Sequence, residues 1–232
     1  MEYKRKLQWN WKKIWEFILF ISLLLSVVYI VIRMILAPDE LTILDEHTKV
    51  KTDYVLMFLQ CSSGLIIMMI PRFIEKKKSV DIPDTIETIF FIFLFCAIYL
   101  GEVQNFYYLI PYWDVILHAF SGMMLGALGF ILVRFLNESH LVHIHLTPFF
   151  ISFFAFCFAV TAGTMWEIYE FLADGILSTN MQKFITADNT VLIGREALKD
   201  TMEDLIVDAI SAFIICFIGY VQLKRFQKNQ VH

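Results

Sequence analysis

Three short acidic patterns in the second half of the chain contain the residues whose types and spacing could do chemistry. The first is an Asp-x-x-x-His pair, the second a Glu-x-x-Glu pair, and the third a run of aspartates four residues apart. Their members are Asp114, His118, Glu167, Glu170, Asp200, Asp204 and Asp208. Carboxylate oxygens combined with one imidazole nitrogen are ligands for Mg²⁺, Mn²⁺, Ca²⁺ or Zn²⁺. The patterns therefore predict a site for a divalent cation, whose identity the residue types leave open.

The spacing places each pattern on one face of a helix. Residues three or four positions apart lie on the same side of a helix, and all three stripes run from acidic residues into small ones. The small residues are Gly122, Gly126, Gly129, Gly163 and Ala212. Small residues let helix backbones approach closely in lipid. We therefore expect three helices that touch along the small residues and spread around one polar cup lined by the acids.

A cation in this cup would activate water or polarise a phosphoryl or acyl oxygen of a substrate. Glu167, Glu170 and His118 are then the candidate catalytic residues, because a general base must be a carboxylate or imidazole next to the bound water. Neither a serine nor a cysteine accompanies the histidine in a recognisable nucleophile motif. Covalent catalysis is therefore disfavoured.

Helix capping is the structural alternative for some of these acids. Asp114 and Asp200 lie where the N-cap residues of helices are expected. Asp200 with Glu203 has the spacing of a capping box, and Asp84 with Glu87 has the same spacing before an earlier apolar segment. We expect Glu87 and Glu203 to cap helices, whereas Asp200 is equally well explained as a cap and as a ligand.

The elements that must position these residues are membrane-spanning helices. The chain is 58% hydrophobic and its mean hydropathy is +0.64, whereas soluble domains are about 45–50% apolar. Apolar segments long enough to cross a bilayer occur at about 14–36, 54–70, 85–101, 112–135, 146–172 and 201–223. We predict an all-α integral membrane protein with six transmembrane helices, which form a single polytopic domain over residues 1–232. A loop over residues 173–199 joins the last two helices.

The distribution of basic residues orients this arrangement. Of the 19 lysine and arginine residues, 13 lie on the side of the two termini and six on the other side. The positive-inside rule then places both termini in the cytoplasm of a cell-membrane protein. All three acidic patterns fall at the outer ends of the last three helices. The inner halves of these helices hold no charged residue before Arg134 and Lys224, which favours a one-sided outer site over a path across the membrane.

Several partner classes can be weighed from composition. No basic stretch is interleaved with aromatic residues in the way that a nucleic-acid site needs, so nucleic acid is not an expected partner, and the lipid bilayer is. The four cysteines fall in separate apolar segments, which indicates packing and not disulfides. The histidines at positions 140, 143 and 145 are interpreted as loop composition.

The three patterns, in this order, are similar to those of the uncharacterised multi-pass inner-membrane proteins of the YjdF type. Those proteins carry a Tyr-Asp-x-x-x-His element, a Glu-x-x-Glu element followed by an aromatic residue, and an Asp-Thr-x-x-Asp element that opens the last helix. The matching residues here are Asp114, His118, Glu167, Glu170, Phe171, Asp200, Thr201 and Asp204. Trp113 stands where the family tends to have tyrosine, and the loop before the last element is longer here.

This resemblance implies a fold and no established activity. The helix with the Asp-x-x-x-His element also resembles, more loosely, VanZ-type membrane proteins linked to glycopeptide resistance. Three classes of function follow from the residues. The chain is a metal-dependent enzyme acting on an envelope lipid or another small-molecule substrate, a cation- or proton-coupled transporter, or a non-catalytic binding or regulatory protein. The one-sided site favours the first and third classes.

Overall fold

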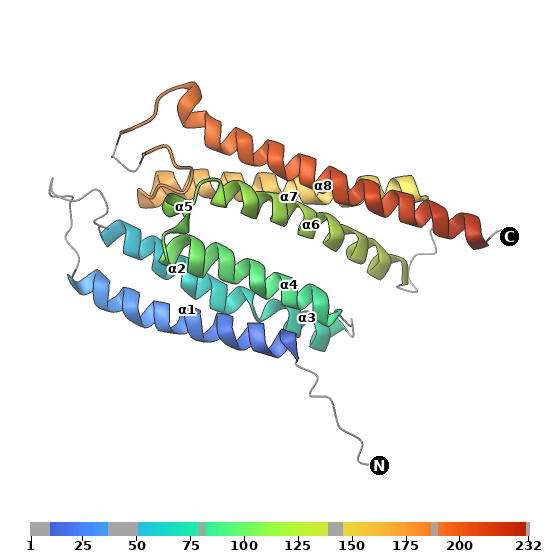
Figure 1. The fold of residues 1–232 in the computed structure, drawn as a ribbon, viewed down its shortest axis with the longest axis horizontal. Coiled ribbons are helices and arrows are strands. Elements are labelled where there is room, and N and C mark those ends of the chain that lie inside the picture. The colour runs from blue at the N-terminus through green and yellow to red at the C-terminus, as the bar shows by residue number, and fades with distance from the viewer. Residues whose placement is uncertain (1–9, 37–50, 79–81, 139–145, 187–189, 231–232) are drawn as a thin grey trace, which may run out of the picture. The chain divides into compact units, whose positions relative to one another are not determined.

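The computed structural model describes residues 10–36, 51–78, 82–138, 146–186 and 190–230. All secondary-structure elements in these residues are helices. The only β-type pairing among the described residues is an isolated antiparallel bridge between Ile185 and Val191. Six helical segments of the described chain are long and apolar enough to cross a membrane. The predicted all-α fold with six candidate membrane spans is therefore confirmed (Figure 1). The histidines at 140, 143 and 145 lie outside the described residues.

The contacts between Cα atoms divide the chain into two compact units. The first holds α1 (Trp11–Leu36), nearly all of α2 (Lys51–Ile67), α3 (Ile70–Lys78), α4 (Asp84–Leu94) and the π-helix η1 (Phe95–Val103). The short helix α5 (Phe106–Leu109) follows. The second unit holds α6 (Trp113–Glu138), α7 (Pro148–Leu177) and α8 (Arg195–Gln230). The single domain expected from the sequence stays a prediction.

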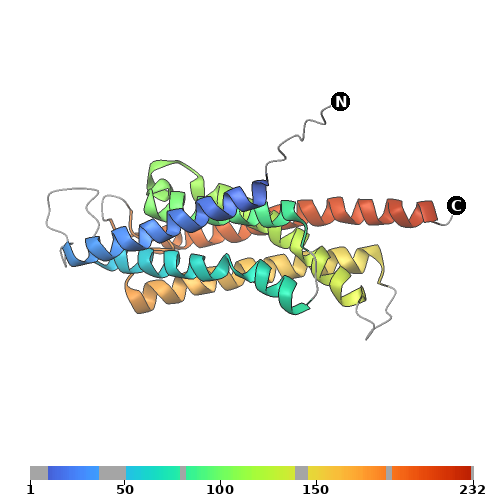
Figure 2. The same cartoon turned by 90° about the horizontal axis from the view of Figure 1, so that it is seen from below.

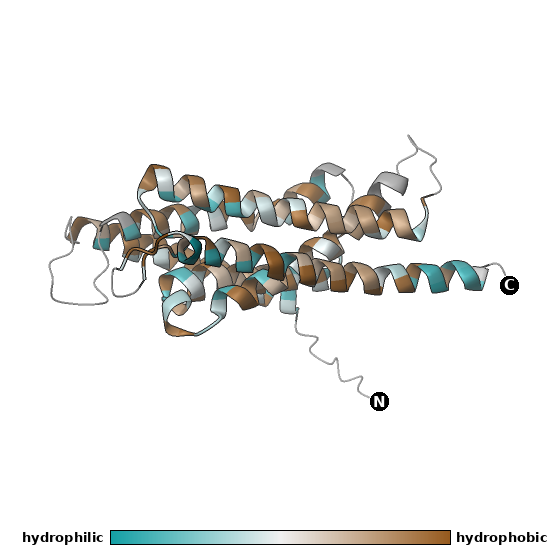
Figure 3. Cartoon of the chain, turned by 90° about the horizontal axis from the view of Figure 1, so that it is seen from above, coloured by the Kyte–Doolittle hydropathy of each residue, from teal (hydrophilic) through white to brown (hydrophobic). Residues whose placement is uncertain are grey.

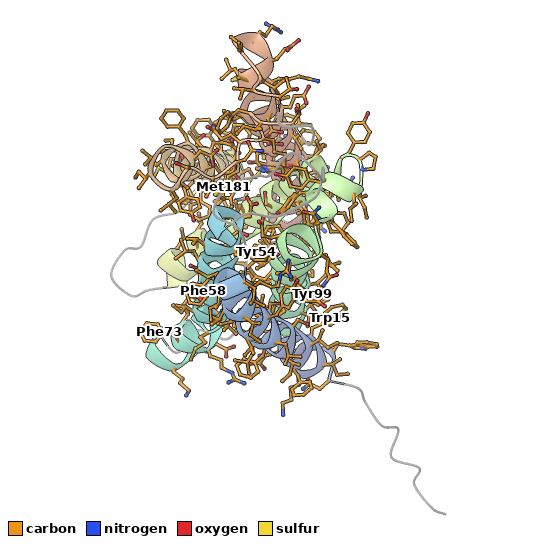
Figure 4. The ribbon with its side chains drawn as sticks, turned by 90° about the vertical axis from the view of Figure 1, so that its left-hand side faces the viewer. Trp15, Tyr54, Phe58, Phe73, Tyr99 and Met181 are labelled. Carbon is orange, nitrogen blue, oxygen red and sulfur yellow. The ribbon has the colours of Figure 1, made fainter. Side chains whose placement is uncertain are left out.

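The first unit is held together by an apolar core between its helices. Its most deeply buried side chains include Leu19 and Leu23 of α1, Met57 of α2 and Phe91 of α4. Next to this core, Trp15 packs edge to face on Phe95, with ring centroids 5.8 Å apart. Figure 4 shows the labelled Trp15 and Tyr99 side chains on this unit, and Tyr99 in turn lies against Phe95. No acidic pattern of the predicted site belongs to this unit.

Glu87 belongs to this first unit, and the prediction that it caps a helix is wrong. The residue before α4 is Pro83, and no side chain caps the helix. Glu87 is instead 1% exposed and forms an ion pair with Lys12 of α1, whose ammonium also lies 3.1 Å from Asp84. An unpaired carboxylate buried between two helices costs more free energy than an uncapped helix terminus, which explains why Glu87 pairs with Lys12.

The second unit is a three-helix assembly in which α6, α7 and α8 each contact both of the others. Figure 2 shows the C-terminal part of α8 continuing past the other two helices, and Figure 3 shows that this extension is hydrophilic while the middle of the helix is largely apolar. Small residues mark the close contacts. A Cβ atom added at Gly129 of α6 would lie 2.7 Å from the Cα of Ala155 in α7. One added at Gly126 would lie 2.5 Å from Ile215 in α8.

Both α7 and α8 extend beyond their apolar segments, which shortens the connection between them. α7 continues to Leu177 and ends at Ser178, which adopts a left-handed conformation with φ 54°. α8 begins at Arg195, about six residues before the expected start. Hydropathy detects the lipid-facing length of a helix and not the polar turns that continue it, so the segment between the two helices is residues 178–194 and not 173–199.

The early start of α8 also decides the capping question for Asp200. Asp200 lies inside the helix, about a turn and a half after it begins, so it cannot be its N-cap. Glu203 forms a surface ion pair of 3.5 Å with Lys199, one turn earlier on the same helix. The predicted capping box at Asp200 and Glu203 is therefore wrong.

Candidate cation site

The seven residues predicted to form the site all lie at one end of the second unit. We call this the acidic end: α6 begins there, α7 ends there and α8 begins there. Five of the seven are buried and two are half-buried. The buried residues are His118, Glu167, Glu170, Asp204 and Asp208, and the half-buried residues are Asp114 and Asp200. The three-helix packing thus brings together patterns that are up to 94 residues apart in the sequence.

His118 is oriented by a carboxylate of a neighbouring helix. Its Nδ1 atom lies 3.2 Å from Oδ2 of Asp208, and the other oxygen of Asp208 accepts a hydrogen bond of 3.0 Å from the Ser121 hydroxyl. A carboxylate accepts but does not donate, so the imidazole Nδ1 carries the proton in this pair. The neutral ring then presents the lone pair of Nε2 to the opposite side, which is the arrangement seen in metal-binding histidines.

The Nε2 atom of His118 faces one carboxylate from each of the three helices. The distances from Nε2 are 3.9 Å to Asp114 Oδ1, 3.8 Å to Glu167 Oε1 and 3.8 Å to Asp204 Oδ2. These separations are too long for hydrogen bonds. The ligand atoms of Asp114, His118 and Asp204 all lie within 4.8 Å of one another. Because Zn²⁺ and Mg²⁺ bind such atoms at about 2.0–2.2 Å, an ion between them requires only small inward movements of the side chains.

Several carboxylate oxygens at this position have no hydrogen bond. Within the described residues, there is no hydrogen-bond partner for either oxygen of Glu167 or for Oδ2 of Asp204. Glu167 is 4% exposed and Asp204 2% exposed, so water does not cover them freely. Buried carboxylates without partners are costly. A cation next to Nε2 would compensate both of them.

Glu170 and Asp200 lie farther toward the surface of the acidic end. Glu170 is buried on α7, three residues beyond Glu167 on the same face of the helix. Asp200 precedes Asp204 by one turn of α8, and its Oδ2 lies 4.0 Å from the ammonium of Lys183. Asp200 thus lies between Asp204 and the segment that follows α7, and Glu170 lies nearer than Glu167 to the end of α7.

The segment after α7 is folded onto the acidic end by Asp174. We call residues 178–186 the strap. The Asp174 carboxylate accepts hydrogen bonds from the Thr179 hydroxyl at 2.6 Å and from the backbone N–H groups of Met181 and Gln182 at 2.7 and 2.9 Å. These bonds explain why an acid lies at a helix C-terminus, where the macrodipole disfavours it. The Gln182 side chain also donates to Thr201 of α8 at 2.7 Å, so the strap joins α7 to α8.

The strap carries Lys183, a residue of the acidic end that sequence reasoning missed. Its ammonium forms an ion pair with Oδ2 of Asp114 and lies 5.0 Å from the centre of the Tyr107 ring. Lys183 has no place in any helical pattern, because it belongs to a segment without periodicity. Its only signal is that it is one of two lysines, with Lys199, between the second and third acidic patterns. That signal does not say which carboxylate it reaches.

Comparison with known proteins agrees with this membrane architecture. The family described as predicted membrane protein (DUF2238) matches residues 16–225 of the chain. An uncharacterized protein of Thermotoga maritima is 29% identical over 155 residues, which are 65% of this chain and 69% of that protein. No solved structure matches the chain. These relatives indicate an uncharacterised membrane-protein family, and the narrower resemblances to the YjdF and VanZ types stay predictions.

Proposed function

We propose that this chain, which belongs to the DUF2238 family of predicted membrane proteins, binds a divalent cation at the acidic end and uses it for chemistry on an envelope lipid or another substrate at the outer membrane surface. One observation carries the proposal. The Nε2 atom of an oriented histidine faces carboxylates from three helices at 3.8–3.9 Å, and two of these carboxylates are buried with unpartnered oxygens.

The geometry supports different roles for the seven predicted residues. We assign His118 Nε2, Asp114, Glu167 and Asp204 as ligands of the cation. Asp208 lies behind the imidazole, where it would orient His118 instead of binding the ion. Orienting carboxylates of this kind raise the basicity of a histidine ligand. The proposal therefore departs from the sequence-based expectation that Asp208 is itself a ligand.

The remaining acids, Glu170 and Asp200, suit roles around the bound ion. A catalytic cation keeps one coordination position for water or substrate, and it lowers the pKa of the bound water toward neutrality. Glu170 is buried next to the proposed ligands on the same face of α7 and is the candidate general base for that water. Asp200 lies toward the strap and would line the approach of a substrate.

A site that opens on one side favours this proposal over transport. Below the acidic end, α6 is closed against its neighbours at Gly126 and Gly129, as the Cβ positions described above indicate. Two buried serines below the acidic end bond to carbonyl groups of their own helices: Ser152 donates to Pro148, and Ser211 donates to Asp208. Side chains satisfied in this way offer no relay for an ion or a proton across the membrane.

Metal analysis of the purified protein tests the cation site. We expect about one divalent ion for each chain in wild type, and loss of that ion in His118→Ala and Asp204→Asn. The matched control is Glu203→Gln, which changes an acid on α8 whose side chain is 53% exposed, one residue before Asp204 in sequence. This variant should bind the ion as wild type does.

Titration calorimetry with Mg²⁺, Mn²⁺, Ca²⁺ and Zn²⁺ identifies the ion and checks the variants. A wild-type protein that binds none of the four, or a His118→Ala variant with wild-type affinity, contradicts the proposal. Flux assays in liposomes then separate the transporter class from the enzyme. A lipid profile of cells that lack the protein separates the enzyme, whose substrate should accumulate, from a binding protein.

A further inference from the structure

One carboxylate lies between the strap and the proposed ion. Oδ2 of Asp114 forms an ion pair with the ammonium of Lys183, while Oδ1 of the same group lies 3.9 Å from His118 Nε2. The ammonium is also 4.0 Å from Oδ2 of Asp200. A positive charge that belongs to the chain itself therefore lies next to the position assigned to the divalent ion.

The strap holds this ammonium in place by an ordered backbone. The residues before Lys183 are anchored to Asp174, and the residues after it are anchored by Asn180, whose side chain accepts from the backbone N–H of Ile185 and donates to its carbonyl. Lys183 itself has φ 47°, a left-handed conformation that is uncommon for a residue other than glycine. The chain thus adopts a specific turn at the residue that delivers the charge.

We propose that Lys183 is a tethered cation that compensates the acidic end in the absence of a divalent ion and leaves Asp114 when the ion binds. The inference rests on the proposed cation site and adds its regulation. Asp114 cannot serve both cations equally, because a divalent ion withdraws charge from the carboxylate and repels the ammonium. Binding of the ion therefore loosens the strap at Lys183, and the strap in turn opposes binding of the ion.

A different role for the same contact would give the opposite result. If Lys183 only positioned Asp114 as a ligand, its removal would weaken ion binding. If Lys183 competes with the ion, its removal strengthens binding. The direction of the change in affinity therefore separates competition from positioning.

Calorimetry of Lys183 variants with the ion that wild type binds tests the proposal. We expect Lys183→Gln and Lys183→Met to bind the ion roughly tenfold more tightly, because a like charge has been removed from the ion's surroundings. Lys183→Arg keeps the charge and should stay close to wild type. The control is Lys199→Gln, which removes an exposed lysine paired with Glu203 and should leave the affinity unchanged.

Hydrogen exchange of the strap gives an independent readout. In wild type, addition of the ion should speed exchange of the backbone amides around Lys183, whereas in Lys183→Gln the exchange should not respond to the ion. Weaker ion binding in both neutral variants, or slower exchange in wild type on addition of the ion, overturns the proposal and leaves the cation site standing. Failure of wild type to bind any ion removes the cation site itself.

Discussion

At the residue scale, the central interaction is the contact between His118 and Asp208. The imidazole places one nitrogen 3.2 Å from Asp208 and turns the other toward three carboxylates. The two nitrogens therefore have different roles, and the carboxylate behind the ring decides which of them is available to an ion. Residue types alone do not separate an orienting aspartate from a coordinating one, since both are acids on the same helix face.

Substitution of Asp208 by asparagine tests that distinction. The amide keeps the size of the side chain but removes the charge, so we expect ion affinity to fall by about 10–100-fold, as for other orienting partners of histidine ligands. Calorimetry on Asp208→Asn and Asp204→Asn provides the comparison. Loss of binding in Asp208→Asn as complete as in Asp204→Asn would mean that Asp208 is a ligand, as the sequence pattern suggested.

At the element scale, the close approach of α7 and α8 sets the position of Asp208. A Cβ atom built on Gly163 of α7 would lie 2.5 Å from Oδ2 of Asp208. The absence of a side chain at this position therefore leaves room for the carboxylate that orients His118. The small-residue stripe has a role beyond helix packing, because at Gly163 the neighbour it admits is a residue of the site.

Gly163→Ala is expected to damage both stability and ion binding. The added methyl group must push Asp208 or the helix away, and overpacking of this kind typically lowers the free energy of unfolding by about 1–3 kcal/mol. Thermal unfolding and ion titration measure the two effects. The control is Gly175→Ala on the same helix, where an added Cβ meets nothing within 4 Å. A Gly163→Ala protein with wild-type affinity would show that the contact with Asp208 does not matter.

At the scale of the whole molecule, six candidate spans and the excess of basic residues on the side of the two termini predict that the acidic end faces outward, and this orientation stays a prediction. A substrate from the outer leaflet or the space beyond it reaches the proposed site only if this end faces outward. The topology is therefore a premise of the proposed function, and it can be tested without knowledge of the reaction.

Labelling of single cysteines in intact cells measures this topology. In a variant without the four native cysteines, Ile193→Cys next to the start of α8 should react with a membrane-impermeant reagent, because this side chain is 83% exposed at the acidic end. Asn229→Cys at the exposed end of α8 should react only after the cells are opened. The reverse pattern would place the acidic end in the cytoplasm and rule out an outer-surface substrate.

Much of this arrangement follows from the sequence by itself. The lengths of the apolar segments determine the number of candidate spans, because a bilayer requires a helix of a certain length. The spacing of three and four residues determines that Asp114 and His118 share a helix face, and likewise Glu167 and Glu170. Segment length and residue spacing are both local, because each depends on a single helix and not on the helices that pack against it.

Tertiary structure decides which atom meets which. The pairing of Asp208 with Nδ1, the approach of Lys183 to Asp114 and the burial of Glu87 against Lys12 all join residues that are far apart in the chain. Such contacts depend on the rotation and depth of one helix against another and on the path of the strap, none of which leaves a periodic trace in the sequence. The acidic patterns therefore indicate where ionisable groups gather, and helix packing assigns each of them its neighbour.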